Sequence, residues 1–371
     1  MNSSGQIVPV DLGSRSYEIS IASGQLTQLG GRLRQWLQLA DDAALKCFVI
    51  TDSNVLPHAN TVRASLTQAG ATVQVACVPS GERSKSIAEA SDLYDQLVDF
   101  QADRRTVVVA AGGGVVGDLA GFVAATYARG LRFVQVPTTL LSMVDSSVGG
   151  KTGVNHPKGK NLIGAFHQPA GVMIDTATLD TLPDREYRSG LAEVVKYGVI
   201  LDEAFFAWLD DNVAGLNERS PDVLQHVVAR SCELKAYVVK EDEYETSGLR
   251  AILNYGHTYA HAFEALSGYG ELLHGEAVAI GMICGSRLAH RLGRIDASVI
   301  DRQIELLQAV GLPTEVPTAL ADQHTAILDC MLLDKKTVAG DLKFVLPDRL
   351  GHVETVGGIA ADDVTACLTA G

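Results

Sequence analysis

A glycine-rich turn at residues 112–118 is the feature that most limits how this chain can fold. It follows an apolar run, 106–110, that is typical of a buried strand, and it precedes an apolar, helix-like stretch, 119–128. Glycines at such a turn leave backbone N–H groups exposed and allow a phosphate to approach closely. The pattern therefore predicts a strand, a phosphate cradle and a helix. The alternative is a tight turn that only packs the helix on the sheet.

The spacing of Gly112, Gly114 and Gly117 matches the dinucleotide-binding pattern G-x-G-x-x-G, but its context is unusual. The motif does not lie on the first predicted strand. The next predicted strand, 132–136, is not followed by an acidic residue that could hold a ribose. Asp52, which follows an earlier apolar run, is the better candidate for that contact.

Polar residues also follow the predicted strand 132–136. It ends in Pro137-Thr138-Thr139, and the segment 145–151, rich in Ser and Gly, comes soon after. Because the carboxyl ends of parallel strands share one edge of a sheet, we expect a ligand to lie across that edge.

Charge and composition disfavour several kinds of partner. The formal net charge of −14 over 371 residues disfavours nucleic acid and anionic membranes. The six cysteines form no C-x-x-C pair, as expected for reduced thiols. The N-terminal residues carry no basic and apolar signal pattern, and no apolar run reaches membrane-spanning length. We therefore expect a cytoplasmic protein.

The pattern of predicted helices and strands changes near Leu182-Pro183. Before this point helix-like and strand-like runs alternate, which predicts βαβ units, and residues 17–21 alternate as an antiparallel strand would. After it helical periodicity dominates, including a predicted helix over 251–266. The sequence thus predicts an α/β N-terminal Rossmann-like domain with a mostly parallel sheet, residues 1–182, followed by a mainly α-helical domain, 183–371.

Residues suited to metal binding occur in the predicted helical domain. His257 and His261 are spaced i and i+4 on one helix face, and His274 precedes a predicted helix start. Glu193 lies one turn before Lys196 in an apolar helix, where a charged pair is costly without partners. The alternatives are a coincidental surface pair of histidines and a simple i,i+3 ion pair. Spacing alone favours a metal site.

A basic segment occupies residues 151–161. Lys151, Lys158 and Lys160 stand among glycines and asparagines in a strongly acidic chain, which suggests a clamp for a phosphate or another polyanion. The alternative is a solvated, lysine-rich loop. A nucleotide cradle, a metal site and a phosphate clamp together indicate oxidation at an alcohol carbon of a phosphorylated polyol.

Several long motifs resemble those of the 3-dehydroquinate synthase family of sugar-phosphate cyclases. The resemblance runs from about Asp52 to Leu346 and rests on the segments 80–85, 112–122, 137–169, 193–198, 254–264, 274–281 and 334–336. One departure is Tyr259, at a position where a small residue is frequent.

The resemblance implies a reaction, cofactors and an assembly. The substrate would be 3-deoxy-D-arabino-heptulosonate 7-phosphate, a phosphorylated sugar acid, and the cofactors NAD and one divalent metal ion, Zn or Co. A hydroxyl is oxidised transiently by NAD, phosphate is eliminated, the ketone is reduced again, the ring opens and an aldol step closes the carbocycle. The family also suggests a homodimer.

The resemblance also assigns roles to single residues. The metal ligands would be Glu193, His257 and His274, and His261 would make a polar contact or transfer a proton. The phosphate would be held by Arg129, Lys151, Asn161 and one of Lys335 and Lys336. The substrate carboxylate and hydroxyls would be held by Lys196, Lys235, Arg250 and Asn254, with Asp145 nearby. NAD would contact Asp52, Glu82, Lys85, Gly113, Gly114, Asp118, Thr138, Thr139, Lys151, Lys160, Thr178 and Thr181.

Three other functions remain open from sequence. A sister cyclase would take a different sugar phosphate, although Asn254 and His261 match the dehydroquinate pattern. A metal- and NAD-dependent polyol dehydrogenase would release reduced NAD and would not need the lysines of 151–160. A non-catalytic NAD-binding or scaffold module would have no use for the charged and metal-binding set of the helical domain.

Overall fold

The structure is a computed structural model that describes residues 5–40, 43–268, 271–333 and 342–368. Its internal contacts divide the chain into two units, which we call unit 1 (residues 1–182 and 221–244) and unit 2 (residues 183–220 and 245–371). Helix α8 (Pro221–Glu241) thus groups with unit 1 although it follows the change of pattern near residue 182. The assignment of NAD binding to residues 1–182 and of substrate binding to residues 183–371 stays a prediction.

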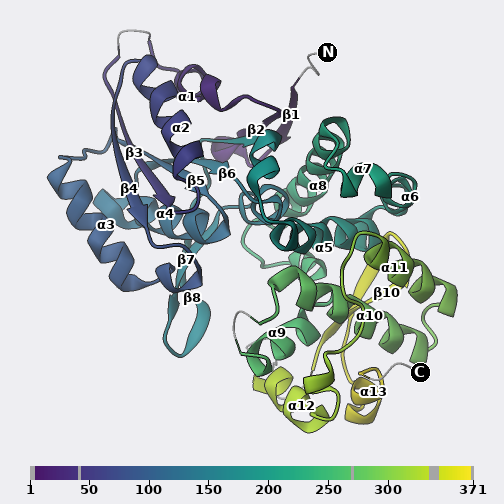
Figure 1. Cartoon of the computed structure of the whole chain (residues 1–371). Coiled ribbons are helices and arrows are strands. Elements are labelled where there is room, and N and C mark those ends of the chain that lie inside the picture. The colour runs from purple at the N-terminus through teal and green to yellow at the C-terminus, as the bar shows by residue number, and fades with distance from the viewer. Residues whose placement is uncertain (1–4, 41–42, 269–270, 334–341, 369–371) are drawn as a thin grey trace. The chain divides into compact units, whose positions relative to one another are not determined.

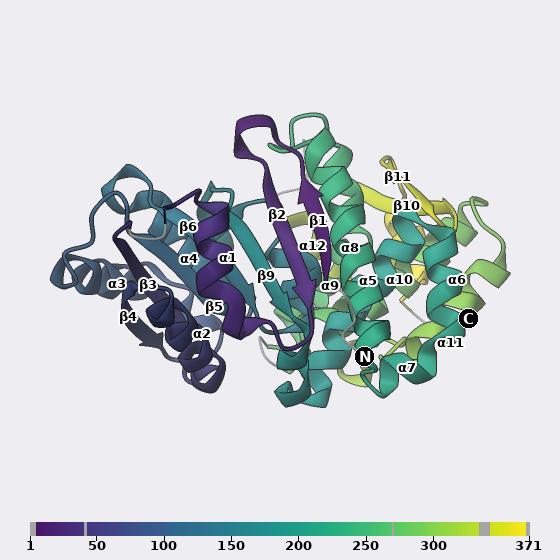
Figure 2. The ribbon, with the colours of Figure 1, turned by 90° about the horizontal axis from the view of Figure 1, so that it is seen from above.

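Unit 1 is built on a seven-stranded sheet in the order β1-β2-β9-β6-β5-β3-β4 (Figure 1). β1 and β2 pair antiparallel and all other neighbours pair parallel, so the predicted mostly parallel sheet is confirmed. Figure 2 shows α8 lying beside β1 and β2. The strands are β1 (Gln6–Val10), β2 (Tyr17–Ala22), β3 (Leu45–Asp52), β4 (Ala71–Val78), β5 (Val107–Gly112), β6 (Arg132–Pro137) and β9 (Gly171–Asp175).

Helices cover both faces of this sheet because alternate residues of each strand point to opposite sides. Phe48 and Ile50 of β3 pack with one pair of helices, α3 (Ile87–Asp99) and α4 (Gly114–Thr126). Cys47 and Val49 pack on the other face with α1 (Leu29–Trp36) and α2 (Leu56–Gln68). The central strands are buried on both sides, which explains their continuous apolar runs.

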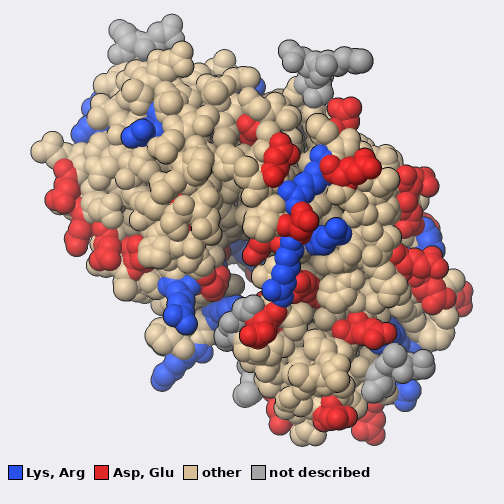
Figure 3. Space-filling model, in the orientation of Figure 1, with Lys and Arg blue, Asp and Glu red and all other residues tan. Residues whose placement is uncertain are grey.

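The basic segment 151–161 forms most of an antiparallel hairpin. Its strands are β7 (Lys151–His156) and β8 (Gly159–Phe166), with Lys151 paired to Phe166. Lys151, Lys158 and Lys160 are all exposed. Figure 3 shows basic side chains gathered where Figure 1 places this hairpin. The predicted loop is therefore largely extended structure that presents lysines to solvent.

Unit 2 is mainly helical, as predicted. Its helices are α5 (Asp184–Leu201), α6 (Glu203–Asp211), α7 (Val213–Asn217), α9 (His257–Leu266), α10 (His274–Arg291), α11 (Ala297–Ala309), α12 (His324–Leu333) and α13 (Ala361–Ala366), and β10 (Phe344–Arg349) pairs antiparallel with β11 (His352–Val356). The predicted single helix over 251–266 is wrong. A 3₁₀ helix, Leu249–Asn254, precedes α9, and Gly256 separates them with a left-handed φ of 80°. No helix in the described part of the chain has both the length and the apolar character needed to cross a membrane.

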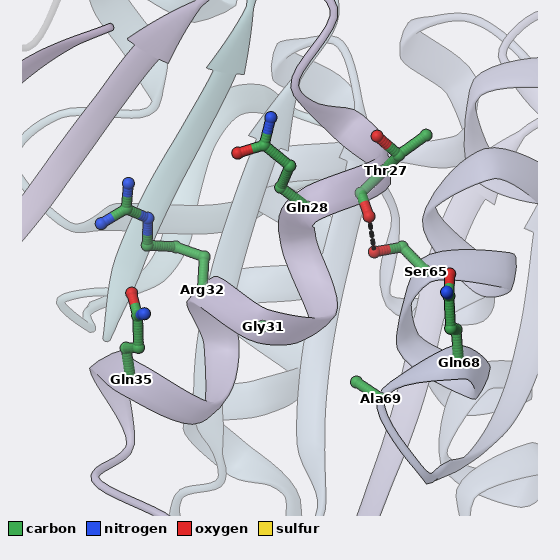
Figure 4. Close-up of a pocket in the computed structure, with 8 residues that line it drawn as sticks. All are labelled: Thr27, Gln28, Gly31, Arg32, Gln35, Ser65, Gln68 and Ala69. Atoms are coloured by element: carbon green, nitrogen blue, oxygen red, sulfur yellow. Dashed lines mark hydrogen bonds between the residues drawn. The ribbon is translucent and has the colours of Figure 1, made fainter.

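Helices α1 and α2 meet so closely that only glycine fits at Gly30. A Cβ there would overlap the backbone of Ser65, whose hydroxyl accepts from the Gly30 N–H at 3.0 Å and donates to Thr27 O at 2.7 Å. Gly31, one residue on, faces a pocket of about 410 Å³ lined also by Gln28, Arg32, Gln35, Gln68 and Ala69 (Figure 4). No atom lies within 4 Å of a Cβ added at Gly31.

These neighbouring glycines give a matched test of helix packing. We expect Gly31→Ala to raise the free energy of unfolding by about 0.5–1 kcal/mol, because alanine is the better helix former. We expect Gly30→Ala to lower it by about 1–3 kcal/mol through overpacking. Urea unfolding followed by Trp36 fluorescence in a Trp208→Phe background measures both, since these are the only tryptophans. Stabilisation by both substitutions would show that the contact at Gly30 does not set the helix spacing.

Candidate active site

Three ligand-type side chains of unit 2 converge from three helices. Glu193 lies in the middle of α5, His257 is the first residue of α9, and His274 is the first residue of α10. One ligand atom from each lies within 4.8 Å of the others. Glu193 Oε1 is 3.7 Å from His257 Nε2 and 3.8 Å from His274 Nε2. The geometry therefore presents one carboxylate oxygen and two imidazole nitrogens to a common point.

Close backbone contacts bring these helices together. A Cβ on Gly275 would overlap the carbonyl oxygen of Ser189 on α5, and the Gly275 N–H donates to the Ser189 hydroxyl at 3.0 Å. A Cβ on Gly281 would overlap the carbonyl oxygen of Gly256, immediately before α9. Helix α10 thus touches both other helices at glycines, one of which directly follows His274.

The chemistry of the three groups fits a divalent metal ion. Glu193 Oε1 is fully buried and has no hydrogen-bond partner among the described residues. A buried carboxylate oxygen without a donor is costly, and a cation bound there would satisfy it. One carboxylate and two imidazoles, with room for further ligands, are the donors of catalytic zinc sites.

Each histidine has its second ring nitrogen next to an acceptor. His257 Nδ1 lies 3.1 Å from the carbonyl oxygen of Tyr255, and His274 Nδ1 lies 3.5 Å from Glu264 Oε1. An imidazole that donates from Nδ1 keeps the Nε2 lone pair for a metal. Both rings are therefore placed to bind through Nε2.

Lys196 is buried beside the cluster. Its ammonium pairs with Glu193 Oε2 and donates to the carbonyl oxygen of Leu253 at 2.7 Å, and its side chain is only 2% exposed. The i,i+3 ion pair between Glu193 and Lys196, which was an alternative from sequence, is thus present, and it is buried in the protein interior. Because an isolated buried charge is strongly disfavoured, the pairing offsets part of the cost of burying these two side chains.

Other predicted substrate residues of unit 2 lie on neighbouring elements. Arg250 is buried in the 3₁₀ helix that ends at Asn254, and its Nε is 3.7 Å from Glu245 Oε1. His261, one turn after His257, has its ring centroid 5.7 Å from that of His257 but is not part of the three-residue group. Tyr259 is buried, and its hydroxyl donates to the carbonyl oxygen of Val364 at 3.0 Å. The unusual tyrosine is therefore a packed core residue.

Three of the predicted cofactor residues of unit 1 lie at one edge of the sheet. Asp52 ends β3, Gly113 is the N-cap of α4 after β5, and Thr138 follows β6. Because β6, β5 and β3 are neighbours and parallel, these carboxyl ends lie side by side. The Thr138 N–H donates to Gly112 O at 3.0 Å. A Cβ on Gly113 would lie 3.2 Å from Thr139, so the turn is tight.

A charged network adjoins this edge. Lys85 is buried and donates to Asp118 Oδ2 at 2.5 Å and to Asn161 Oδ1 at 2.6 Å. Burial raises the pKa of the Asp118 carboxyl, and the Lys85 ammonium acts in the opposite direction. Asn155 donates to Glu82 Oε1 at 2.7 Å and accepts from the Asn161 N–H at 2.9 Å. The structure thus connects Glu82, Lys85, Asp118 and Asn161.

Lys235 of α8 forms a second buried pair in unit 1. Its Nζ donates to Asp145 Oδ1 at 2.5 Å and to the Asp145 carbonyl oxygen at 2.6 Å. Thus α8 supplies a buried cation to unit 1 although it follows the change of pattern at residue 182.

Arg129 and Asn161 both adopt left-handed backbone, with φ of 68° and 55°. This conformation is uncommon for residues other than glycine, and such strain is concentrated at functional sites. Among the described residues the same conformation also occurs at Gln38, Gln101, Ala128, Arg219 and Glu245, so it does not by itself mark a site.

The remaining predicted residues are placed as follows. Thr178 is buried and donates to the Asp175 carbonyl oxygen, and Thr181 Oγ1 lies 2.9 Å from His58 Nε2. Gly114 starts α4. Lys335 and Lys336 lie outside the described residues.

A second group of potential metal ligands, Asp348, His352 and Glu354, lies on the β10–β11 hairpin. Asp348 Oδ1 lies 2.8 Å from His352 Nδ1, and both carboxylates also pair with arginines, Asp348 with Arg349 at 3.3 Å and Glu354 with Arg294 at 2.6 Å. This group is an ion-pair cluster.

Sequence reasoning did not assign roles to Asn155, Glu245 or Glu264. Asn155 and Glu264 lie inside motifs singled out for other residues, so the motifs alone gave no reason to select them. The signal for Glu264 is its spacing of i+7 from His257, which repeats the helix face of His257 and His261.

Solved structures of similar fold include cyclases with NAD⁺ and a divalent metal ion bound. A structure of 2-deoxy-scyllo-inosose synthase complexed with carbaglucose-6-phosphate, NAD⁺ and Co²⁺ is 26% identical, with a TM-score of 0.86 over 98% of this chain and 99% of that chain. A 2-epi-5-epi-valiolone synthase from Streptomyces hygroscopicus with NAD⁺ and Zn²⁺ bound is 26% identical, with a TM-score of 0.84 over 96% and 97%. The chain therefore has the fold of the sugar-phosphate cyclases.

The sequence matches are more specific. Models of the 3-dehydroquinate synthase N-terminal and C-terminal regions match residues 75–189 and 190–337. The 3-dehydroquinate synthase of Desulforamulus reducens is 52% identical over 98% of this chain and 99% of its own, and that of Rhodopirellula baltica is 50% identical over 98% and 96%. The chain belongs to the 3-dehydroquinate synthase family, which confirms the resemblance drawn from its motifs.

The ligand geometry distinguishes His274 from His261. We expect His274→Ala to weaken Zn²⁺ affinity by more than about 100-fold, because it removes a ligand outright, whereas loss of a residue that only hydrogen-bonds to a ligand costs about 10–100-fold. His261→Ala is expected to keep an affinity close to that of the wild type. Chelator competition measures both, and NAD binding by calorimetry should be largely retained in both variants. Equal loss of metal in the two variants would contradict the assigned ligand set.

Proposed function

We propose that this chain converts 3-deoxy-D-arabino-heptulosonate 7-phosphate to 3-dehydroquinate and phosphate. The observation that carries the proposal is the convergence of Glu193, His257 and His274 in a chain whose full-length relatives are named for this activity. The product would serve aromatic amino acid biosynthesis through the shikimate pathway.

Glu193, His257 and His274 would hold one Zn²⁺ or Co²⁺. A metal bound there supplies Lewis acidity, which lowers the pKa of coordinated hydroxyls and stabilises developing oxyanions. Lys196, held by Glu193 and Leu253 O, would present a fixed ammonium to an anionic substrate group. Arg250 and Asn254 would bind the carboxylate and hydroxyls, and His261 would make a polar contact or carry a proton.

The carboxyl edge of the unit 1 sheet would hold NAD. When bound, NAD supplies a transient hydride acceptor that is regenerated in each turnover. Gly113 and Gly114 would leave room for its pyrophosphate at the start of α4, and Asp52 would bind a ribose hydroxyl. The other proposed contacts are Glu82, Lys85, Asp118, Thr138, Thr139, Lys151, Lys160, Thr178 and Thr181.

Basic and amide side chains would neutralise the phosphate. Arg129, Lys151 and Asn161 are proposed to bind it, with one of Lys335 and Lys336, and Lys235 with Asp145 would contact substrate hydroxyls. We further propose that the protein is a cytoplasmic homodimer.

One assay separates this function from its alternatives. We expect the purified protein, with catalytic NAD, Zn²⁺ and the heptulosonate phosphate, to release phosphate stoichiometrically without accumulating reduced nicotinamide. Phosphate assay and absorbance of the reduced cofactor are followed together. Accumulation of reduced NAD without phosphate would indicate a polyol dehydrogenase. Silence in both channels, with turnover of another sugar phosphate, would indicate a sister cyclase.

Cys77 provides a probe of the proposed NAD site. Cys77 is exposed, but some desolvation of its thiol and the charge of Asp52 raise the pKa of that thiol. Its alkylation should therefore be slow at neutral pH and accelerate as the pH rises. We expect saturating NAD to slow alkylation of Cys77 at pH 8.5, because the ligand would cover the edge near Asp52. Peptide mass spectrometry measures the rate, with Cys330 of α12 as the internal control. Equal rates with and without NAD would contradict ribose binding at Asp52.

A further inference from the structure

We propose that Glu264 is a positioning residue that orients His274 for metal binding. The inference rests on the proposed function only in requiring a divalent metal at Glu193, His257 and His274. It concerns Nδ1 of His274, whereas the nitrogen that lies toward Glu193 is Nε2. Glu264 Oε1 lies 3.5 Å from that atom, Nδ1.

Helix α9 brings Glu264 to this place. His257, His261 and Glu264 follow at i, i+4 and i+7, so they share one face of the helix. The same helix therefore supplies one metal ligand at its first residue and, two turns later, a carboxylate for the ligand of the next helix. The Glu264 side chain is 13% exposed, which limits screening by solvent.

The two nitrogens of His274 lie next to different carboxylates. Nε2 is 3.8 Å from Glu193 Oε1, and Nδ1 is 3.5 Å from Glu264 Oε1. A neutral imidazole carries one proton, and metal binding at Nε2 requires that proton on Nδ1. A carboxylate beside Nδ1 accepts it as a hydrogen bond, fixes the ring and makes Nε2 a stronger donor to the metal.

His257 offers an internal comparison. Its Nδ1 lies 3.1 Å from the Tyr255 carbonyl oxygen, a backbone group that needs no particular side chain. His274 begins its helix, and its ring is 32% exposed against 13% for His257. The more exposed ligand thus depends on a side chain for its orientation, and substitution can remove that side chain.

The test measures zinc affinity of the full chain by chelator competition, independently of turnover. We expect Glu264→Ala to weaken binding by up to roughly 100-fold and Glu264→Gln by roughly 10-fold, because the amide oxygen still accepts from Nδ1 but carries no charge. Glu305→Ala is the matched control, since Glu305 is exposed on α11 and its removal changes the net charge equally. Co²⁺ absorption spectra report on the coordination of each variant.

The outcomes separate the inference from the proposed function. Wild-type zinc affinity in a folded Glu264→Ala variant, with loss in His274→Ala, would overturn the role of Glu264 and leave the metal site intact. Absence of zinc binding by the wild type would overturn both. If Glu264→Ala does not fold by circular dichroism, Glu264→Gln decides the question. An unchanged affinity in that variant would refute the inference.

Discussion

The contacts of α10 with α5 and α9 at glycine residues are the constraint on which unit 2 depends. Gly275 meets Ser189, and Gly281 meets Gly256, at distances that leave no space for a side chain. Only at such an approach can one oxygen of Glu193 face imidazoles from two other helices. The cost of burying that carboxylate is offset by Lys196 and, on the proposed function, by a cation. Metal binding and the packing of these helices should therefore be coupled.

Unit 1 also contains buried charges, which are lysines paired with carboxylates. Lys85 and Lys235 are each at least nine-tenths buried, and each donates to a carboxylate, Asp118 and Asp145 respectively. Lys196 repeats the arrangement in unit 2 with Glu193. Such cations are oriented before any ligand arrives, so they need little reorganisation when charge develops nearby. The exposed lysines of the β7–β8 hairpin lack this burial and would act mainly through local positive charge.

Local patterns predicted the elements but not their tertiary contacts. Apolar runs and the glycine turn predicted β5, α4 and the parallel sheet, because these depend on residues close in sequence. Helix α8 was expected with unit 2, since its periodicity says nothing about which core it packs against. The break at Gly256 was missed because the flanking residues keep a helical pattern. The partners of buried charges, such as Asp145 for Lys235, come from 90 residues away and leave no local trace.

The two histidines of α9 show that sequence spacing alone does not identify the metal ligands. An i,i+4 pair shares a helix face, and the spacing alone favours a metal held by both. In the structure the ring centroid of His257 is 5.7 Å from that of His261 and 5.3 Å from that of His274, so proximity hardly separates them. What separates them is the direction of Nε2: His257 and His274 both present it to Glu193 Oε1. The carboxylate of Glu193, on a third helix, thus determines which imidazoles can bind the same ion. The remaining role of the α9 face is to orient His274 through Glu264.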